Sequence, residues 1–340
     1  MIRQSIARLT KDDFERLNEQ ETRKVAEEIM SGEATPSQIS SFITALRIRG
    51  ERVENIVGFV RVMREMATPL KVPENVEILD TCGTGGDGSN TFNISTVSAL
   101  ICASAGVKVA KHGNRGVSSS CGSADVLEKL GVRIDISPEK SAECLEKYNF
   151  CFLFAPVYHK AMKYAVVPRK EIGIRTIFNL IGPLSNPAGA TCQVIGVFDE
   201  SLLDLFAETL KNLGAHRAIV VHGSAGLDEL SLLSASTIAE LGADGRIEMY
   251  PVEPADYDME TCEINDLVGG GAEENARIVH NIFEGKGGHK MNAALLNAGA
   301  GLYISGKSDS IYEGVLLARE TVESGKPAAL VEKLRDFTNR

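Results

Sequence analysis

The chain has 340 residues, of which 44% are hydrophobic and 24% are charged, and its formal net charge is -10. This is the composition of an ordinary globular protein, and the length predicts two domains or one large domain with a smaller attachment. The acidic balance argues against a nucleic-acid partner, which would require a basic surface, but not against a small anionic substrate in a locally positive pocket.

The cysteines and the apolar runs indicate where the protein is located and argue against a membrane-spanning segment. Seven cysteines are an odd number, and no pair has the Cys-x-x-Cys spacing of a zinc or redox site. The amino terminus has no apolar run long enough for a signal peptide, and no later run reaches the length of a membrane-spanning helix. We therefore expect reduced thiols in a cytoplasmic protein that does not associate with membranes.

Residues 1–70 are predicted to form a small all-helical domain. Thr35-Pro-Ser-Gln38 has the pattern of a capping box with proline at the first helical position, and apolar residues at helical spacing follow it up to Gly50. A second helical pattern runs from Val53 to Met63, and an earlier helix is expected over 21–30. Such helical faces most often bury a core, so we expect no chemistry from this part alone.

Residues 71–340 are predicted to form a larger α/β domain with a mostly parallel central sheet, because strands alternate with helices. Ser137-Pro138 begins one helix, and Gly131 and Gly214 end others. Functional side chains are expected on the loops after the strands. The predicted strands are Glu77–Asp80, Val107–Ala110, Val132–Ile136, Phe150–Phe154, Cys192–Phe198 and Ala218–His222.

Residues 155–190 interrupt the alternation of strands and helices. The run from Leu180 to Pro187 combines helix-ending and turn residues, and a segment at about 165–190 suits a crossing between two domains. Further along, residues 253–266 are predicted to be a polar loop, and the three glycines at 269–271 precede a helix over 272–284.

A glycine-rich loop follows the first predicted strand. Four of the six residues from Gly83 to Gly88 are glycine, and Ser95 or Thr96 is expected to cap the next helix. Glycines let the backbone approach a ligand, and a helix N-terminus offers N–H groups to an anion, although a simple tight turn has the same pattern. Asp87 and Asn93 do not suit a plain phosphate cradle, but sugar hydroxyls or a metal-bound phosphate would account for them.

A second polar, glycine-bearing stretch runs from Lys111 to Ser123, one strand and one helix later. Two such loops at consecutive strand ends are expected to lie side by side at the carboxyl edge of the sheet. Its serines either donate hydroxyl hydrogen bonds to phosphate or simply belong to a flexible loop. Both can hold, because a loop that closes over phosphates must be mobile before it closes.

Four motifs in this order resemble those of the anthranilate phosphoribosyltransferase family: Gly83-Thr-Gly-Gly-Asp87, Asn93-Ile-Ser-Thr96, Lys111-His-Gly-Asn-Arg115 and Asn186-Pro-Ala188. The resemblance spans nearly the whole chain. It implies the nucleoside phosphorylase/phosphoribosyltransferase fold class, with a helical domain that supplies a homodimer contact and half of the substrate cleft. It also implies Mg²⁺-dependent transfer of the phosphoribosyl group of 5-phosphoribosyl 1-pyrophosphate (PRPP) to the amine of anthranilate, in tryptophan biosynthesis.

The resemblance also implies which residues bind the two substrates. No general acid or base is assigned, because an aromatic amine is neutral and carries its lone pair at physiological pH. For PRPP the implied residues are Gly83, Gly86, Asp87, Thr91, Asn93, Ile94, Ser95, Thr96, Lys111, His112, Gly113, Asn114, Arg115, Gly116, Val117, Ser118, Ser119 and Ser123. For anthranilate they are Gly83, His112, Asn114, His159 and Arg169, with Tyr158 and Met162 as further pocket residues.

Within this set, Arg169 would hold the anthranilate carboxylate as a planar bidentate partner. Each histidine has an equally good interpretation as a structural, hydrogen-bonded residue. Lys160 follows His159 where members of the family usually have proline, which leaves the geometry of that loop open.

Asp228 and Glu229 are the candidate metal ligands. Two adjacent acids in a glycine-bearing loop could converge on Mg²⁺, or they could form a solvated acidic turn. The resemblance favours metal binding and adds the hydroxyl of Ser95.

Two other functions fit some of these features. A pyrimidine nucleoside phosphorylase has a related fold, but its phosphate-site lysine motif differs from Lys111-His-Gly-Asn-Arg115, and metal-independent phosphorolysis would not need Asp228 and Glu229. A nucleic-acid-binding relative of the fold is disfavoured by the acidic balance and by the full set of site residues.

Overall fold

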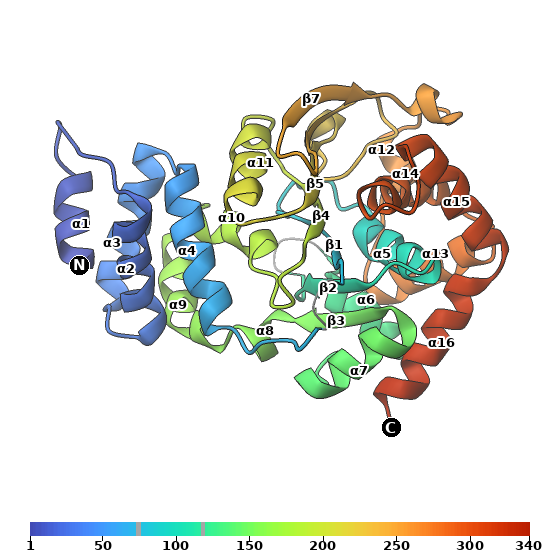
Figure 1. Ribbon diagram of the computed structural model, residues 1–340, viewed down its shortest axis with the longest axis horizontal. Helices are drawn as coiled ribbons and strands as arrows, with labels where there is room; N and C mark the ends of the chain where they lie inside the picture. Colours follow the sequence, from blue (N-terminus) through green and yellow to red (C-terminus); the bar gives the residue numbers. More distant parts are fainter. Residues whose placement is uncertain (73–75, 117–119) are drawn as a thin grey trace.

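The computed structural model describes residues 1–72, 76–116 and 120–340. Figure 1 shows two lobes: a bundle of N-terminal helices, and a larger lobe in which helices cover both faces of a twisted sheet. The predicted fold class, a small helical domain plus a larger α/β domain, is confirmed. Within the described residues, no helix is both long enough and apolar enough to cross a bilayer.

The N-terminal lobe is built from amphipathic helices with well-formed caps. The Thr35 side chain accepts a hydrogen bond from the Gln38 backbone and the Gln38 side chain accepts one in return, which confirms the predicted capping box. Asn18 and Glu21 form a second box that the sequence analysis did not identify, and the first helix was also missed. The four helices are α1 (Ile2–Leu9), α2 (Glu19–Ser31), α3 (Pro36–Arg49) and α4 (Val53–Met66).

In the described residues, the sheet of the larger lobe has seven strands in the order β3-β2-β1-β4-β5-β6-β7. The first five strands run parallel, whereas β6 and β7 are antiparallel additions at one edge. The mostly parallel sheet is therefore confirmed. Its strands are β1 (Leu79–Gly83), β2 (Val109–Gly113), β3 (Phe150–Phe154), β4 (Cys192–Gly196), β5 (Arg217–His222), β6 (Ser236–Leu241) and β7 (Ile247–Val252).

Several predicted elements are wrong in kind or position. The predicted strand Val132–Ile136 is an irregular segment, because the Arg133 backbone N–H donates to Thr338 Oγ1 at 3.0 Å and not to a neighbouring strand. The hairpin of β6 and β7 was not predicted. The cap of the helix after the glycine loop is Asn93, so the predicted caps Ser95 and Thr96 lie inside the helix.

Helices cover the two faces of the sheet unequally. Helices α5, α14, α15 and α16 pack together on one face, whereas α10 and α11 lie on the other and join the sheet to α4 (Figure 1). The helices are α5 (Ile94–Ser104), α6 (Ser123–Lys129), α7 (Pro138–Tyr148), α8 (Ala155–Tyr158), α9 (Lys163–Ile172), α10 (Ile177–Leu184), α11 (Leu202–Asn212), α12 (Ile264–Leu267), α13 (Ala272–Phe283), α14 (Gly288–Ile304), α15 (Ile311–Glu323) and α16 (Lys326–Thr338), with the 3-10 turns η1 (Lys160–Met162), η2 (Ser224–Gly226) and η3 (Pro254–Tyr257).

The segment that interrupts the alternation returns to the N-terminal lobe. Helix α9 packs against α2 and α3, and α10 packs against α3 and α4. Ala165 and Ile177 belong to the same apolar cluster as the core of the N-terminal helices. Residues 253–266, predicted as a loop, contain η3 and α12, whereas the helix predicted over 272–284 is confirmed as α13.

Candidate functional site

The ends of the parallel strands meet at one edge, and two glycines allow a third loop to lie directly on it. Gly83, the last residue of β1, pairs with Gly196, the last residue of β4. A Cβ atom at Gly83 would lie 2.2 Å from Oδ2 of Asp228, and one at Gly196 would lie 1.5 Å from the Asp228 carbonyl oxygen. Glycine is required at both positions because the loop after β5 occupies that space.

The two predicted metal ligands are tied to the glycine loop and to the next helix. Asp228 Oδ2 accepts a hydrogen bond from the Gly85 backbone N–H at 2.7 Å. Glu229 Oε1 accepts one from the Ser95 backbone N–H at 3.1 Å, in the first turn of α5. The structure therefore brings together groups that lie 143 and 134 residues apart in the sequence, which only the packing of the loop after β5 achieves.

These carboxyl groups hold their protons more tightly than ordinary acids. Burial, together with the charge of Asp87, raises the pKa of Asp228 to about 6. Burial and the neighbouring Asp228 also raise the pKa of Glu229. Three acids thus converge in a space where negative charge is poorly compensated, and a cation placed among them would relieve the repulsion.

Lys111 is the buried basic residue of this edge. It is 1% exposed, and its Nζ donates to the Thr81 carbonyl and, at 3.2 Å, to Ser95 Oγ. Burial lowers the pKa of Lys111, although the charges of Asp80 and Glu229 oppose that shift. Ser95 therefore links the lysine to the Glu229 carboxylate.

Asp80 is a residue that the sequence analysis missed. It is fully buried; its Oδ1 accepts from the His112 backbone N–H at 3.2 Å and its Oδ2 accepts from Asn186 Nδ2 at 2.8 Å. Asn186 also donates to the Ala110 carbonyl at 2.8 Å. This network holds the end of β2 against the segment after α10. Its only sequence signal was the Asn186-Pro-Ala188 motif.

The second loop is held by its own helix. The Gly116 and Gly122 backbone N–H groups both donate to Asp125 Oδ2 at 2.9 Å. Arg115 is exposed and pairs with Asp125 at 3.1 Å and with Glu128, so α6 occupies its guanidinium. The predicted residues Val117, Ser118 and Ser119 lie outside the described residues.

Three further predicted residues of the second loop and strand end lie close together. The Asn114 carbonyl accepts from Ser123 Oγ at 3.4 Å, and a Cβ atom at Gly113 would lie 2.2 Å from that same hydroxyl oxygen. The backbone at the end of β2 thus approaches the start of α6 closely, which places the two parts of the motif against each other.

The residues between the glycine loop and α5 connect the loops to the rest of the fold. Asn93 Nδ2 donates to the Cys121 carbonyl at 3.0 Å, and its Oδ1 accepts from Asn275 Nδ2 at 2.9 Å. Thr91 forms an isolated bridge with Val268. The side chains of Ile94 and Thr96 are buried and face the core.

Two neutral histidines lie together beneath the crossing segment. His112 and His159 are 8% and 7% exposed, and their ring centroids are 5.0 Å apart. Burial lowers the pKa of His112 to about 3 and that of His159 to about 4. In the described part of the chain, Nε2 of each ring is buried and has no hydrogen-bond partner. Met162 and His159 also line a small cavity with methionines of the N-terminal lobe, and Tyr158 is buried in the core.

Two arginines of the crossing segment differ in what they contact. Arg169 lies on α9 with its guanidinium carbon 5.3 Å from the centre of the Phe178 ring, and among the described residues no hydrogen bond or ion pair joins it to the loops. Arg175, which the sequence analysis did not single out, donates from Nη2 to the Gly86 carbonyl and lies 3.9 Å from the centre of the Phe198 ring. Arg175 thus connects the crossing segment to the glycine loop.

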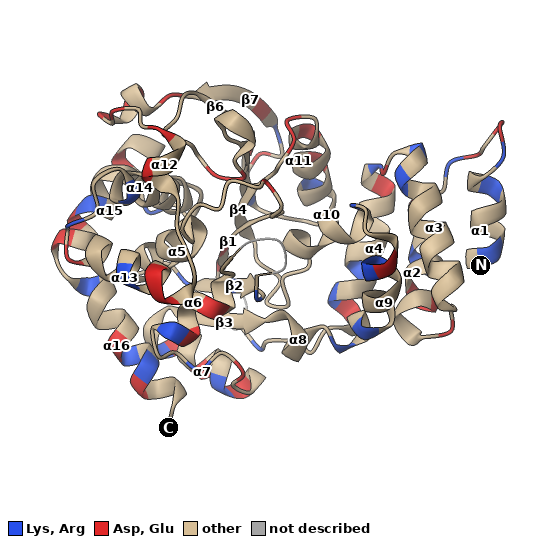
Figure 2. Ribbon diagram, turned by 180° about the vertical axis from the view of Figure 1, so that it is seen from behind, with Lys and Arg blue, Asp and Glu red and all other residues tan. Residues whose placement is uncertain are grey.

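Charged residues of both signs are spread along the helices and loops. Figure 2 shows basic and acidic residues interspersed over both lobes. That distribution differs from the basic stripe typical of nucleic-acid binding.

Comparisons with known proteins cover almost the whole chain. Residues 3–67 match the helical bundle domain of a glycosyl transferase family, and residues 75–328 match the a/b domain of that family. The anthranilate phosphoribosyltransferase of Geobacter sp. (strain M21) is 50% identical over 100% of this chain and 99% of its own length, and that of Methanobrevibacter smithii is 50% identical over 100% of both.

Solved structures agree with these relatives. The crystal structure of anthranilate phosphoribosyltransferase from Thermus thermophilus has a TM-score of 0.93 and 43% identity, and covers 100% of this chain and 99% of that one. The Saccharomyces cerevisiae enzyme in complex with PRPP and Mg has a TM-score of 0.90 and 26% identity, over 99% of this chain and 98% of that one.

Proposed function

This chain belongs to the anthranilate phosphoribosyltransferase family, and from that premise we propose that it transfers the phosphoribosyl group of PRPP to the amine of anthranilate. The products are N-(5-phosphoribosyl)anthranilate and pyrophosphate, and the step belongs to tryptophan biosynthesis. The observation that carries the proposal is the convergence of Asp228, Glu229 and Lys111 with the glycine loop at one edge of the sheet. The phosphorylase alternative is not favoured by the relatives.

In this proposal the two loops bind PRPP. The glycine loop approaches the diphosphate closely with its backbone, because Gly85, Gly86 and Gly88 adopt positive φ without the steric cost of a side chain. The Ser95 N–H in the first turn of α5 instead holds Glu229 in place. Lys111 supplies a fixed positive charge, and Asn114, Ser123 and the remaining residues of the second loop provide polar contacts to phosphate and ribose.

The acids of the site fit Mg²⁺. The carboxylates of Asp228 and Glu229 and the hydroxyl of Ser95 are hard oxygen donors, and burial together with a neighbouring acid raises the pKa of each carboxyl, which a bound cation would offset. When bound with PRPP, Mg²⁺ would offset the charge that grows on the departing pyrophosphate. Asp228, Glu229 and Ser95 would hold the ion and, through it, orient the leaving group.

The acceptor is assigned to the side of the cleft formed by the crossing segment. Arg169 is proposed to bind the anthranilate carboxylate, and Gly83, Asn114, His112 and His159 to contact the rest of the molecule. Burial keeps both histidines neutral, and their Nε2 atoms have no partner among the described residues, so a substrate that reaches them would gain hydrogen bonds without meeting a positive charge. Orientation and exclusion of water then carry the transfer, since the amine needs no general base.

In this assignment, each lobe forms the binding side for one of the two substrates. Residues 1–70, with the crossing segment at about 165–190, form the acceptor side, and residues 71–340 form the PRPP side. The packing of α9 and α10 against α3 and α4 supports it, because it places the crossing segment within the helical lobe.

A fluorescence assay tests the proposed reaction. Anthranilate emission should disappear when the protein, PRPP and Mg²⁺ are combined, and chelation of Mg²⁺ should stop the decrease. Thymidine with phosphate is the parallel control and should not be cleaved. Persistent anthranilate emission together with release of thymine would replace this proposal with the phosphorylase.

The family also supports two broader proposals, a homodimer and a cytoplasmic location. A groove of about 520 Å³ lies between α1 and α3, and beside it Ile48 is 75% exposed, which is unusual for a side chain of this size. A second copy would cover this apolar face. Light scattering should give twice the mass of the chain, and Ile48→Glu should shift it to the monomer. No disulfide joins the cysteines of the described residues, in keeping with the cytoplasm.

A further inference from the structure

A second polar cluster lies at the edge of the sheet opposite to the candidate site. Glu77 precedes β1, Cys192 begins β4 and His216 precedes β5, and these three strands are neighbours. Because the strands are parallel, residues at their starts lie at the amino edge, whereas the phosphate loops follow their ends. The cluster is therefore separate from the transfer reaction.

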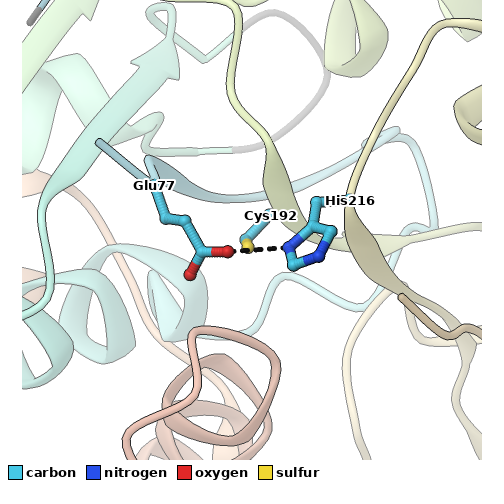
Figure 3. Close-up of side chains that lie close together, drawn as sticks. All are labelled: Glu77, Cys192 and His216. Atoms are coloured by element: carbon cyan, nitrogen blue, oxygen red, sulfur yellow. Dashed lines mark hydrogen bonds and ion pairs between the residues drawn. The ribbon is translucent and has the colours of Figure 1, made fainter. Parts of the chain in front are cut away.

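The three side chains converge on one point. A carboxylate oxygen of Glu77, Sγ of Cys192 and a ring nitrogen of His216 all lie within 4.8 Å of one another. Figure 3 shows the sulfur beside the hydrogen bond between His216 Nδ1 and Glu77 Oε1, which is 2.7 Å long. The ligand atoms of a tetrahedral site with bonds of about 2.0–2.3 Å lie roughly 3.3–3.8 Å apart, so small side-chain rotations close the remaining gap.

Backbone hydrogen bonds hold these residues in position without a metal. The Cys192 N–H donates to the Ile78 carbonyl at 3.0 Å, and the His216 N–H donates to the Thr191 carbonyl at 2.8 Å. The Ile78 N–H donates to Thr191 Oγ1 at 3.1 Å, next to Glu77. The main chain needs no rearrangement to present the three ligands, and such preorganisation lowers the cost of binding.

The donor set selects the class of ion. One thiolate, one imidazole and one carboxylate suit Zn²⁺ and similar transition metals, whereas Mg²⁺ prefers oxygen ligands. The side chains of Glu77 and His216 are 47% and 50% exposed, so a water molecule can complete four-coordination. We infer that Glu77, Cys192 and His216 form a surface site for Zn²⁺, whose ion joins the starts of three neighbouring strands. On binding, the Cys192 thiol gives its proton to solvent.

Co²⁺, a coloured substitute for Zn²⁺, provides the direct test on the full-length protein, with excess Mg²⁺ present to occupy the acids of the candidate active site. A thiolate-to-cobalt charge-transfer band should appear, saturate at one equivalent and disappear when Zn²⁺ is added. Cys192→Ala should abolish it, whereas Cys262→Ala and His280→Ala, which alter a thiol and an imidazole elsewhere, should retain it. Absence of the band in the wild type, or its persistence in Cys192→Ala, overturns the inference.

Thermal unfolding separates a metal site from a folding defect. Zn²⁺ should raise the Tm of the wild type, because a ligand that binds only the folded state stabilises it. In His216→Ala, an exposed substitution, Zn²⁺ affinity should fall at least about tenfold and the Tm increase should shrink, with unchanged activity in Mg²⁺. An equal Tm increase in His216→Ala and in the wild type would show that Glu77 and His216 form only a surface ion pair.

Discussion

Lys111 and Arg115 come from one five-residue motif, but they lie in two regions that differ in the burial and the pairing of their charged groups. At the carboxyl edge of the sheet, Lys111 is buried near acids that outnumber it, and burial raises the pKa values of Asp228 and Glu229. At the start of α6, Arg115 is exposed and its guanidinium is occupied by Asp125 and Glu128.

Asp125, the acid that pairs with Arg115, has a lowered pKa. Burial opposes ionisation of Asp125, but hydrogen bonds from Gly116 and Gly122 and the charge of Arg115 prevail, so its pKa is lowered. A satisfied acid of this kind holds a loop in place. Asp228 and Glu229 each accept a backbone hydrogen bond, but burial still raises their pKa values, so their ionised forms would be stabilised by a bound cation; we therefore assign them to binding.

The largest effect is expected from Asp228→Asn. The substitution removes a charge from the metal-binding acids but preserves an oxygen for the Gly85 N–H. kcat/KM in Mg²⁺ should fall about 10²-fold or more, the scale seen when a group that stabilises transition-state charge is lost. Asp244→Asn, at an exposed turn, is the matched control. Steady-state kinetics within about twofold of the wild type would remove Asp228 from the site.

The second-largest effect is expected at Lys111, and the same substitution at Arg115 provides the comparison. Lys111→Met should lower kcat/KM for PRPP roughly 10- to 100-fold, because a hydrogen bond to a charged group contributes about 1.5–3 kcal/mol. Arg115→Met should lower it less than about threefold, since Asp125 and Glu128 already occupy the guanidinium. A circular-dichroism melt of each variant excludes unfolding. Equal losses in the two variants would contradict the distinction between the regions.

Arg169→Ala should act on the acceptor alone. The KM for anthranilate should rise about tenfold or more, because a charge-assisted contact to the carboxylate is lost. kcat and the KM for PRPP should change little. Lys170→Ala, a neighbour on α9, serves as the control. A variant with an unaltered KM for anthranilate would show that another residue binds the carboxylate.

The smallest effect concerns stability and its dependence on pH. Because the pKa of Asp228 is raised in the folded state, this residue contributes most to the free energy of unfolding below about pH 4, where it is protonated in both states. That contribution is lost as the pH rises through about 6. Without metal, Asp228→Asn should therefore gain stability relative to the wild type as the pH rises from about 4 to about 7.

Asp125→Asn should show the opposite sign. Because the pKa of Asp125 is lowered in the folded state, ionised Asp125 stabilises the protein above its unfolded-state pKa. This stabilisation is lost as the pH falls through the lower pKa of the folded state. This variant should be less stable than the wild type at neutral pH and approach it in acid. Urea unfolding in acid and at neutral pH measures both variants, and parallel behaviour of the two would refute the contrast.

The elements that were predicted correctly depend on short-range signals. Thr35 and Gln38 lie three residues apart, Ser137 caps α7 through its own side chain, and β3 has the predicted bounds of Phe150–Phe154. The failures depend on distant partners. Residues 132–136 have the composition of a strand, but Thr338, 205 residues after Arg133, takes the backbone N–H that a strand would use.

The sequence by itself determined the helices around Thr35 and Val53 with the Thr35–Gln38 cap, the two glycine-bearing loops and the family to which they belong, because propensity, capping and motif spacing act within a few residues. Only the tertiary structure decided how the charges are placed: that Asp228 accepts from Gly85, that Asp80 accepts from Asn186 beside β2, and that Arg115 is ion-paired while burial raises the pKa values of Asp228 and Glu229. Burial and long-range hydrogen bonds set these energies, and neither can be obtained from a residue's neighbours in the chain.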